Sequence, residues 1–400
     1  MGGAGARSGA VRSCVLVTAM LAMVFAGGCS RFQRKPADKY VYVTAQQAYL
    51  VDRVAAVSNR VGNVSNGEKL VVLDRARHWV KVKTPQGQVG FIKEKDVATQ
   101  ETYEQFDGIT KEHEKDPAIG TGTVRDQANL HLAPGRDTAH FFLLAEGDKV
   151  KLLSRATLPK VAPGSVAAAK PAAKVEPAKA GAKGAAADAA APPPPAMEDW
   201  WLVRDTKGHT GWLLSRMMEV DAPETLLRYA EGQRIVGAYV LEHLNDPESG
   251  QLRDGQPDPD IPVYVTVLSP YKAGLPYDFD QVRVFTWNLK KHRYETAFRE
   301  KNIEGYLPVT VKQMTDPYGH APNSAVPLPA FTYRVLAAEA PQPVPDAVTG
   351  IVKPGKLVEK TYRLEGNITR RILAPGTQPP AEAHPMPEPE KKGAKKKGKR

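Results

Sequence analysis

A short pattern of one tryptophan and two glycines occurs twice in this chain with the same spacing. In each copy the tryptophan lies eight residues before the first glycine, and the two glycines are three residues apart. An aromatic residue directly follows the second glycine. Equal spacing of this kind indicates that one structural unit is repeated. The positions are Trp79, Gly87, Gly90 and Phe91 in the first copy and Trp200, Gly208, Gly211 and Trp212 in the second.

The residues before each pattern agree in spacing as well. Leu50 lies 17 residues before Gly67, and Leu130 lies 17 residues before Gly147. Residues 79–83 alternate apolar and basic side chains, which is typical of a β-strand with one buried face. A glycine between such strands permits a sharp turn or a close contact with another side chain. Both copies are therefore predicted to consist of short strands and tight turns.

The first copy resembles a bacterial SH3 domain, a small barrel of five to seven strands that is common in exported cell-envelope proteins. The second copy is predicted to share this fold because its spacing is the same. We therefore predict an all-β chain with two small SH3-like barrels, residues 40–98 and 121–222, joined by a connector at residues 99–120. The resemblance rests on Leu50, Gly67, Trp79, Gly87, Gly90 and Phe91.

The second copy contains an insertion at residues 161–196, which is rich in alanine, lysine, proline and glycine. Such a composition buries too little apolar surface to offset its ordering entropy, so we predict a disordered loop. It is predicted to be a loop within one domain because the strand residues after it are needed to complete the barrel. Closing a loop of this length costs only about 1 to 2 kcal/mol more than closing a short one.

A third domain is predicted at residues 223–376, where β-rich segments alternate with turn residues. We expect a small β-sandwich or open barrel there, and its sequence resembles no family that we can name. Residues 377–400 are rich in proline, glutamate and lysine and are predicted to form an unfolded tail. The predicted strands of the third domain are residues 235–241, 261–268, 282–287, 293–299, 307–313, 331–336 and 360–364.

The N-terminal residues have the order of a secretory signal peptide. Two arginines precede an apolar run at residues 14–26, which is too short for a membrane-spanning helix. Small residues and then Cys29 follow this run. This order resembles the lipobox of bacterial lipoproteins. The resemblance implies that residues 1–28 are removed, that the Cys29 thiol is lipidated, and that residues 29–39 tether the protein to a membrane.

Two further inferences concern the compartment. Ser30 follows the cysteine, and under the enterobacterial sorting rule a residue other than aspartate there implies an outer-membrane lipoprotein facing the periplasm. The other cysteine, Cys14, lies in the signal, so no disulfide partner or cysteine nucleophile remains for the mature body. We expect a protein of the cell envelope, anchored to the membrane by its lipid.

Positive charge is concentrated at the two ends of the chain. The formal net charge is +11, but two arginines lie in the signal and seven basic residues lie among the last ten positions. The rest of the chain therefore has a net charge of about +2. No basic face for nucleic acid is indicated, and we expect no nucleic-acid partner.

Aromatic side chains near the repeated patterns are the candidate ligand-binding residues, because small barrels bind extended peptides through apolar contacts and edge hydrogen bonds. Trp200 and Trp201 point in opposite directions along a strand. Trp201 shares its face with Val203 and is assigned to the core, whereas Trp200 shares its face with Arg204 and is assigned to the surface. The candidate ligand-binding residues are Tyr49, His78, Trp79, Phe91, Trp200 and Trp212.

No pattern in the sequence predicts a metal, a cofactor or a catalytic site. The histidines lack the spacing of metal ligands on one helix. An acidic stretch at residues 246–260 offers oxygen ligands for calcium, but its prolines favour a solvated turn. No nucleophile elbow or phosphate-binding glycine loop occurs. We predict that the protein is not an enzyme.

The sequence therefore favours a cell-envelope lipoprotein whose SH3-like domains bind peptidoglycan or peptides. Two alternatives remain. The barrels could bind other envelope proteins, which would make the protein a scaffold or assembly component of an envelope complex. Alternatively, the third domain could contain an enzyme active site that the sequence does not reveal.

Overall fold

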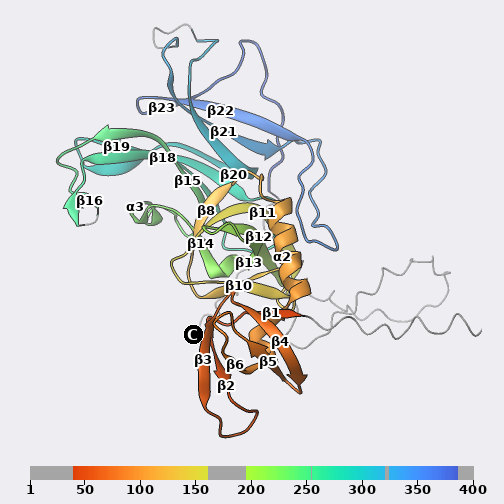
Figure 1. Ribbon diagram of the computed structural model, residues 1–400. Helices are drawn as coiled ribbons and strands as arrows, with labels where there is room; N and C mark the ends of the chain where they lie inside the picture. The colour runs from red at the N-terminus through yellow and green to blue at the C-terminus, as the bar shows by residue number, and fades with distance from the viewer. Residues whose placement is uncertain (1–38, 161–194, 254, 320–323, 386–400) are drawn as a thin grey trace, which may run out of the picture.

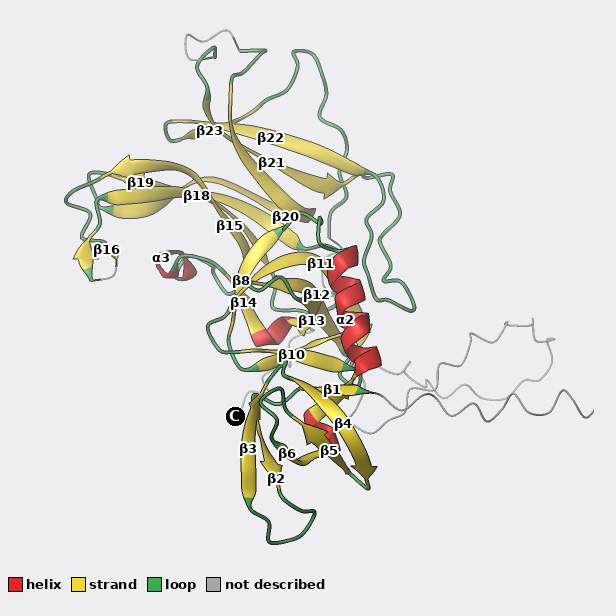
Figure 2. Cartoon of the chain, viewed as in Figure 1, coloured by secondary structure: helices red, strands yellow, loops and turns green. Residues whose placement is uncertain are grey.

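The computed structural model describes residues 39–160, 195–253, 255–319 and 324–385 (Figure 1). Within these residues, three seven-stranded antiparallel sheets follow one another along the chain, with a separate two-stranded hairpin of β16 (Leu252–Arg253) and β17 (Gln256–Pro257). The first sheet, in red and orange, lies at one end, and the third, in green to blue, lies at the other. Strands dominate Figure 2, so the all-β prediction is confirmed.

The first sheet, which we call the first barrel, follows the alternation in its sequence. Val80, Val82 and Ile92 are almost fully buried, and they pack against Leu50 and Leu70 in one core. A 3₁₀ turn, η2 (Glu94–Asp96), precedes the last strand. The spatial order is β3 (Arg60–Ser65), β2 (Gln47–Val51), β6 (Val89–Lys93), β5 (Trp79–Lys83), β4 (Lys69–Ala76), β1 (Tyr40–Val43) and β7 (Val97–Thr99).

The second sheet has the same strand order, with every strand number raised by seven. The second glycine of the repeated pattern has the same role in both sheets. A Cβ atom on Gly90 would lie 2.9 Å from Leu50 Cβ, and one on Gly211 would lie 2.8 Å from Leu130 Cβ. Only glycine permits this approach between neighbouring strands. The order is β10 (His140–Leu144), β9 (Ala128–His131), β13 (Thr210–Leu214), β12 (Met197–Asp205), β11 (Lys149–Pro159), β8 (Gly120–Val124) and β14 (Met218–Val220).

The insertion separates two strands of this second sheet that are hydrogen-bonded to each other. β11 and β12 pair from Val150 opposite Asp205 to Pro159 opposite Met197. The residues before and after the insertion therefore belong to one sheet. Residues 161–194, which make up most of the insertion, lie outside the described residues.

A helix, α2 (Gln100–Glu112), joins the first barrel to the second sheet. It begins after Thr99, whose hydroxyl accepts a backbone N–H of the first turn at 3.2 Å. Phe106 is fully buried in the core of the second sheet. Tyr103 stacks on Tyr42 of the first barrel, with ring centroids 4.0 Å apart. No helix in the described ranges has the length and apolar composition needed to cross a lipid bilayer.

The third sheet, which we call the C-terminal sheet, runs up and down so that strands pair in chain order. A one-turn helix, α3 (Glu224–Leu227), and the 3₁₀ turn η3 (Ser215–Met217) precede it. All seven predicted strand segments lie within its strands. The order is β15 (Arg234–Asn245), β18 (Asp260–Ser269), β19 (Phe279–Asn288), β20 (Arg293–Met314), β21 (Leu328–Leu336), β22 (Leu357–Glu365) and β23 (Ile368–Arg371).

One long strand, β20, replaces two predicted strands at residues 293–299 and 307–313. Its first part pairs with β19, its last part pairs with β21, and Gly305 pairs with both neighbours. A Cβ atom on Gly305 would lie 2.0 Å from the Phe279 ring. The glycine therefore lets one strand pass over this ring and change partners, so no turn is needed between the two segments.

The predicted unfolded tail begins later than the sequence indicated. Ala338 donates its N–H to the carbonyl of Ala381 at 3.1 Å, and Ala383 donates to the carbonyl of Leu336 at 2.9 Å. The Glu382 carboxylate accepts from the Lys360 ammonium at 2.9 Å. The prediction is therefore wrong for residues 377–385, because backbone bonds and a buried cation hold this segment beside β21. Residues 386–400 lie outside the described residues.

Candidate ligand-binding site

The outer face of the first barrel carries aromatic and basic side chains on neighbouring strands. Trp79 lies opposite Lys93, and Lys81 lies opposite Phe91, on the solvent side of β5 and β6. β2 pairs with β6 next to Phe91, and Tyr49 on β2 is 41% exposed on the same side. We call Tyr49, Trp79, Lys81, Phe91 and Lys93 the aromatic-basic face.

Cations lie against the rings of this face. The Lys93 ammonium is 5.9 Å from the Trp79 ring centre, and the Lys81 ammonium is 5.7 Å from that of Phe91. The Arg60 guanidinium of β3 is 3.8 Å from the Tyr49 ring centre. Such contacts within about 6 Å are attractive because the face of an aromatic ring is electronegative. They hold the side chains in place while the charged groups stay at the surface.

A groove of about 550 Å³ lies at one end of the face. Trp79 and Lys93 line it together with His78, Glu94 and Lys95. His78 is exposed and has a φ of 60°, which places it in the tight turn between β4 and β5. Its carbonyl accepts the Glu94 N–H at 3.0 Å, so the turn is tied to η2.

The structure thus brings four of the predicted ligand-binding residues, Tyr49, His78, Trp79 and Phe91, to one side of the first barrel. Partly exposed rings offer flat apolar contacts, and the ammonium groups beside them attract carboxylates. The rings and cations alternate across adjacent strands. This arrangement suits an extended ligand that carries both apolar and acidic groups.

The second sheet offers no comparable face around its tryptophans. Trp200 is only 2% exposed and Trp212 only 5% exposed, so the prediction that Trp200 lies at the surface is wrong. Ile109 of α2, Met217 of η3 and Ile351 of a distant loop pack over this side of the sheet. Strand alternation could not reveal this cover, because it comes from other parts of the chain. Trp201, assigned to the core, is 7% exposed and buried as predicted.

The first carboxylate of the acidic stretch at residues 246–260 is hydrogen-bonded to other side chains of the protein. Asp246 is 4% exposed and accepts hydrogen bonds from Trp287 Nε1 at 2.6 Å and His292 Nδ1 at 2.8 Å. The bond from Trp287, followed by that from His292, holds the pKa of Asp246 below its usual value. Among the described residues, no three His, Cys, Asp or Glu side chains are grouped so that they could hold a metal ion.

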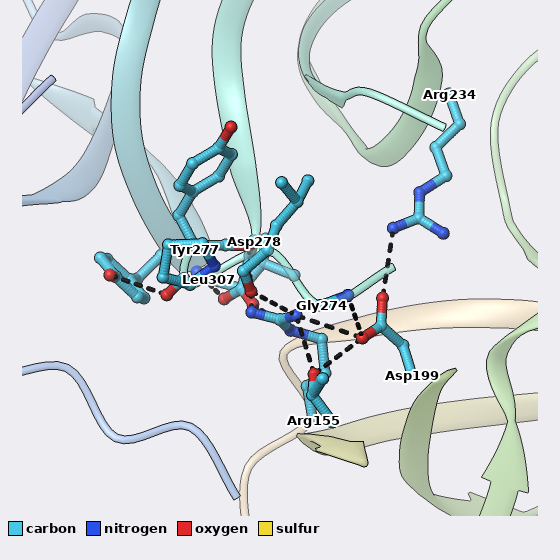
Figure 3. Close-up of polar contacts among 11 residues, drawn as sticks. Arg155, Asp199, Arg234, Gly274, Tyr277, Asp278 and Leu307 are labelled. Carbon is cyan, nitrogen blue, oxygen red and sulfur yellow. Dashed lines mark hydrogen bonds and ion pairs between the residues drawn. The ribbon is translucent and has the colours of Figure 1, made fainter. Parts of the chain in front are cut away.

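A buried arginine joins the second sheet to the C-terminal sheet (Figure 3). Arg155 of β11 donates from Nε to Asp278 Oδ1 at 2.9 Å, and from Nη1 and Nη2 to the carbonyls of Leu275 and Tyr277 at 3.0 Å. Asp278 Oδ2 in turn accepts the Leu307 N–H of β20. Arg155 therefore binds three points of the loop between β18 and β19.

Asp199 of β12 completes this network from the second sheet. Its Oδ1 accepts from the Thr157 hydroxyl at 2.7 Å and from the Gly274 N–H at 3.1 Å, and it lies 3.7 Å from Arg155 Nη1. Sequence reasoning missed these residues. The available signal was one arginine inside the apolar strand sequence of residues 149–159, which indicates a buried charge but not its partner.

Comparison with protein-family models finds one match within the chain. Residues 53–98 match the bacterial SH3 domain, in agreement with the strand order of the first barrel. This match covers β3 to β6 and most of the aromatic-basic face. No curated protein matches the chain.

Three solved structures illustrate the structural similarities of the chain. A protein named NlpC2 from Trichomonas vaginalis is 9% identical with a TM-score of 0.14, and the overlap covers 49% of this chain and 55% of that chain. An NlpC/P60 family protein from Bacillus cereus is 10% identical with a TM-score of 0.21, covering 64% and 98%. NlpC1 from Trichomonas vaginalis is 8% identical with a TM-score of 0.14, covering 67% and 90%.

These neighbours correct one prediction. The prediction that the protein is not an enzyme is contradicted, because the three structures named above are NlpC or NlpC/P60 proteins. At these identities and TM-scores they assign neither an activity nor catalytic residues to this chain. The family match to the bacterial SH3 domain is the finding that bears on its ligand.

Proposed function

We propose that this protein is a lipid-anchored protein of the bacterial cell envelope that binds peptidoglycan or peptides through its first barrel. The observation that carries the proposal is the aromatic-basic face, which lies largely within the segment that matches the bacterial SH3 domain. The proposed ligand is extended, and it carries carboxylates beside apolar or sugar groups.

The geometry of the face supports this ligand class. Trp79 and Phe91 lie on adjacent strands, so a ligand crossing β5 and β6 would contact both rings. Lys81 and Lys93 lie beside these rings and would pair with acidic groups of the same ligand. Lys93 and His78 of the groove are exposed. The electrostatic contribution to ligand binding at this site would therefore be weakened by salt.

Replacing Trp79 by alanine should weaken adsorption of the full chain to purified sacculi by about tenfold or more, since a tryptophan at the centre of a binding site typically contributes about 2 kcal/mol and every 1.4 kcal/mol is about tenfold. A Lys81→Gln/Lys93→Gln variant should bind weakly at low salt and lose most of its salt dependence. A sedimentation assay at about 0.1 M and about 1 M salt measures both effects, as the screening length falls from about 10 Å to about 3 Å.

Two variants far from the first barrel serve as controls. Tyr318→Ala removes an aromatic side chain that is 44% exposed, and Lys290→Gln removes an exposed lysine of the hairpin between β19 and β20. Both should adsorb like the unchanged protein. Equal adsorption of the Trp79 and control variants would reject the face as the binding site. Binding to envelope proteins without binding to sacculi would favour the assembly role.

The second sheet is proposed to be another SH3-like domain, since its strand order and pattern glycines equal those of the first barrel. Its equivalent tryptophans are buried, so we do not propose the same ligand face there. In this proposal the second sheet connects the ligand-binding barrel to the C-terminal sheet. The membrane anchor is proposed to be the lipidated Cys29, which lies outside the described residues.

A Cys29→Ser change should abolish incorporation of labelled palmitate and move the protein out of the mature membrane-bound form. The expected products are an uncleaved precursor or a released protein, because no thiol remains for the lipid. Metabolic labelling followed by membrane fractionation measures this result. The matched control is Cys14→Ser, which changes the other cysteine and should leave labelling intact. Unchanged labelling of the Cys29 variant would exclude lipidation at this position.

A further inference from the structure

A cavity of about 800 Å³ lies between the second sheet and the C-terminal sheet. Its volume falls within the range of about 300 to 1,000 Å³ that is usual for small-molecule sites. Trp201, Leu214 and Met218 form an apolar wall on the second sheet, and Ile235 and Val236 of β15 continue this wall on the C-terminal sheet. The site is separate from the aromatic-basic face, so an inference about it is independent of the proposed function.

The charged residues that line the cavity leave an excess of positive charge. Five arginines and one lysine line it, against four carboxylates. Three of the arginines are used by carboxylates of the same lining, in the pairs Arg155 with Asp278, Arg136 with Glu198 and Arg125 with Glu219. The other cations are Arg216, Lys160 and Arg234.

Arg234, the first residue of β15, is the one of these three cations that is partly buried, and its side chain is poorly paired. A guanidinium has five N–H donors, and that of Arg234 makes no hydrogen bond to any residue in the described ranges. Its sole ion pair within those ranges joins Nη2 to Asp199 Oδ2 across 3.9 Å, which is beyond hydrogen-bond distance (Figure 3). The side chain is 31% exposed, so a ligand can reach it.

The Asp199 carboxylate does not fully neutralise Arg234, because it also interacts with Arg155. Its Oδ1 is held on the other side by Thr157, Gly274 and the nearby Arg155. Burial, opposed by Asp199 and assisted by Arg155, lowers the pKa of Arg234. An anion at Arg234 would therefore supply hydrogen-bond acceptors to a guanidinium that is partly desolvated and poorly paired.

We propose that this cavity binds a small amphipathic carboxylate, with the carboxylate at Arg234 and an apolar body against Trp201 and Val236. Guanidinium and carboxylate groups match in geometry and form two parallel hydrogen bonds. The apolar wall accounts for a ligand that is more than a bare anion. Such a carboxylate could belong to a fatty acid or to the end of a short apolar peptide, and both share the recognised chemistry.

Calorimetric titration of the full chain in lipid nanodiscs tests the proposal, with empty nanodiscs as the blank. The probes are decanoate and N-acetyl-alanyl-leucine, and their uncharged amides are the matched ligands. We expect at least one carboxylate to bind and its amide to bind about tenfold to a hundredfold more weakly. Binding of decanoate alone identifies a fatty acid, and binding of the peptide alone identifies a peptide end.

The Arg234→Gln change should lower the affinity for the carboxylate probe by about tenfold to hundredfold. The affinity for the amide probe should stay unchanged. Arg370→Gln is the control, because this arginine is 61% exposed, belongs to β23 at the opposite edge of the C-terminal sheet from β15, and does not line the cavity. Should Arg234→Gln fail to fold, Ala273→Phe decides the matter, since Ala273 is exposed and lines the cavity. This larger side chain should block both probes.

Three results would overturn the proposal. The first is that neither carboxylate binds. The second is equal affinity for a carboxylate and its amide, which would show that charge is not recognised. The third is an unchanged affinity in Arg234→Gln, or in Ala273→Phe where the first variant does not fold, which would place the carboxylate elsewhere on the protein.

Discussion

Replacing Arg155 by methionine should destabilise the folded protein by about 3 to 5 kcal/mol. The side chain is 7% exposed, and its three donor groups hold Asp278 and two carbonyls of the loop between β18 and β19. Methionine fills much of the same volume but leaves the Asp278 carboxylate buried without its cation. Urea unfolding followed by tryptophan fluorescence measures the loss.

Two further variants identify the cause of this loss. Arg370→Met removes an arginine that is 61% exposed and paired with Glu365, so it should change stability by less than about 1 kcal/mol. Adding Asp278→Asn to Arg155→Met should restore part of the stability, because no unpaired carboxylate is then left buried. An Arg155→Met protein as stable as the unchanged chain would show that this network does not hold the two sheets together.

Replacing Lys360 by methionine should also lower the free energy of unfolding by about 3 to 5 kcal/mol. Lys360 is 2% exposed and lies between the carboxylates of Glu300 and Glu382, while the hydroxyls of Tyr333 and Tyr362 donate to Glu300. Burial lowers the pKa of Lys360, but the two carboxylates outweigh this effect and the pKa is raised. Without the cation, two carboxylates would face each other in a buried site.

The raised pKa sets the pH range in which this contribution acts. A folded-state pKa above the ordinary value of about 10.4 means that the stabilisation is complete below that pH and is lost as the pH rises through the folded-state value. Lys356→Met is the matched control, since that lysine is 71% exposed and paired with Glu339. It should cost less than about 1 kcal/mol.

Proteolysis gives a second measurement for Lys360. Loss of the cation should release residues 381–385 from β21, because Glu382 is held there by Lys360 and by two backbone hydrogen bonds nearby. Cleavage within this segment should therefore become faster in Lys360→Met than in Lys356→Met. Equal unfolding midpoints and equal cleavage rates for the two variants would contradict a structural role for the buried lysine.

The sequence could predict the first barrel in detail because its information is local. Alternation in β5 and β6 separates Val80 and Val82 from Trp79 and Lys81, and the glycines mark positions where strands approach closely. The same local rules located the strand segments of the C-terminal sheet. They did not show that β20 is one strand, since that depends on Gly305 passing over the Phe279 ring.

The sequence by itself determined the strand content, the repeated pattern and the aromatic residues available for binding. Only the tertiary structure decided which of them are exposed. Trp79 and Trp200 occupy equivalent positions, but α2 and the loop at Ile351 cover Trp200 and nothing comparable covers Trp79 within the described residues. The Arg155 network and the cavity at Arg234 also depend on contacts between residues far apart in the chain, which no local pattern encodes.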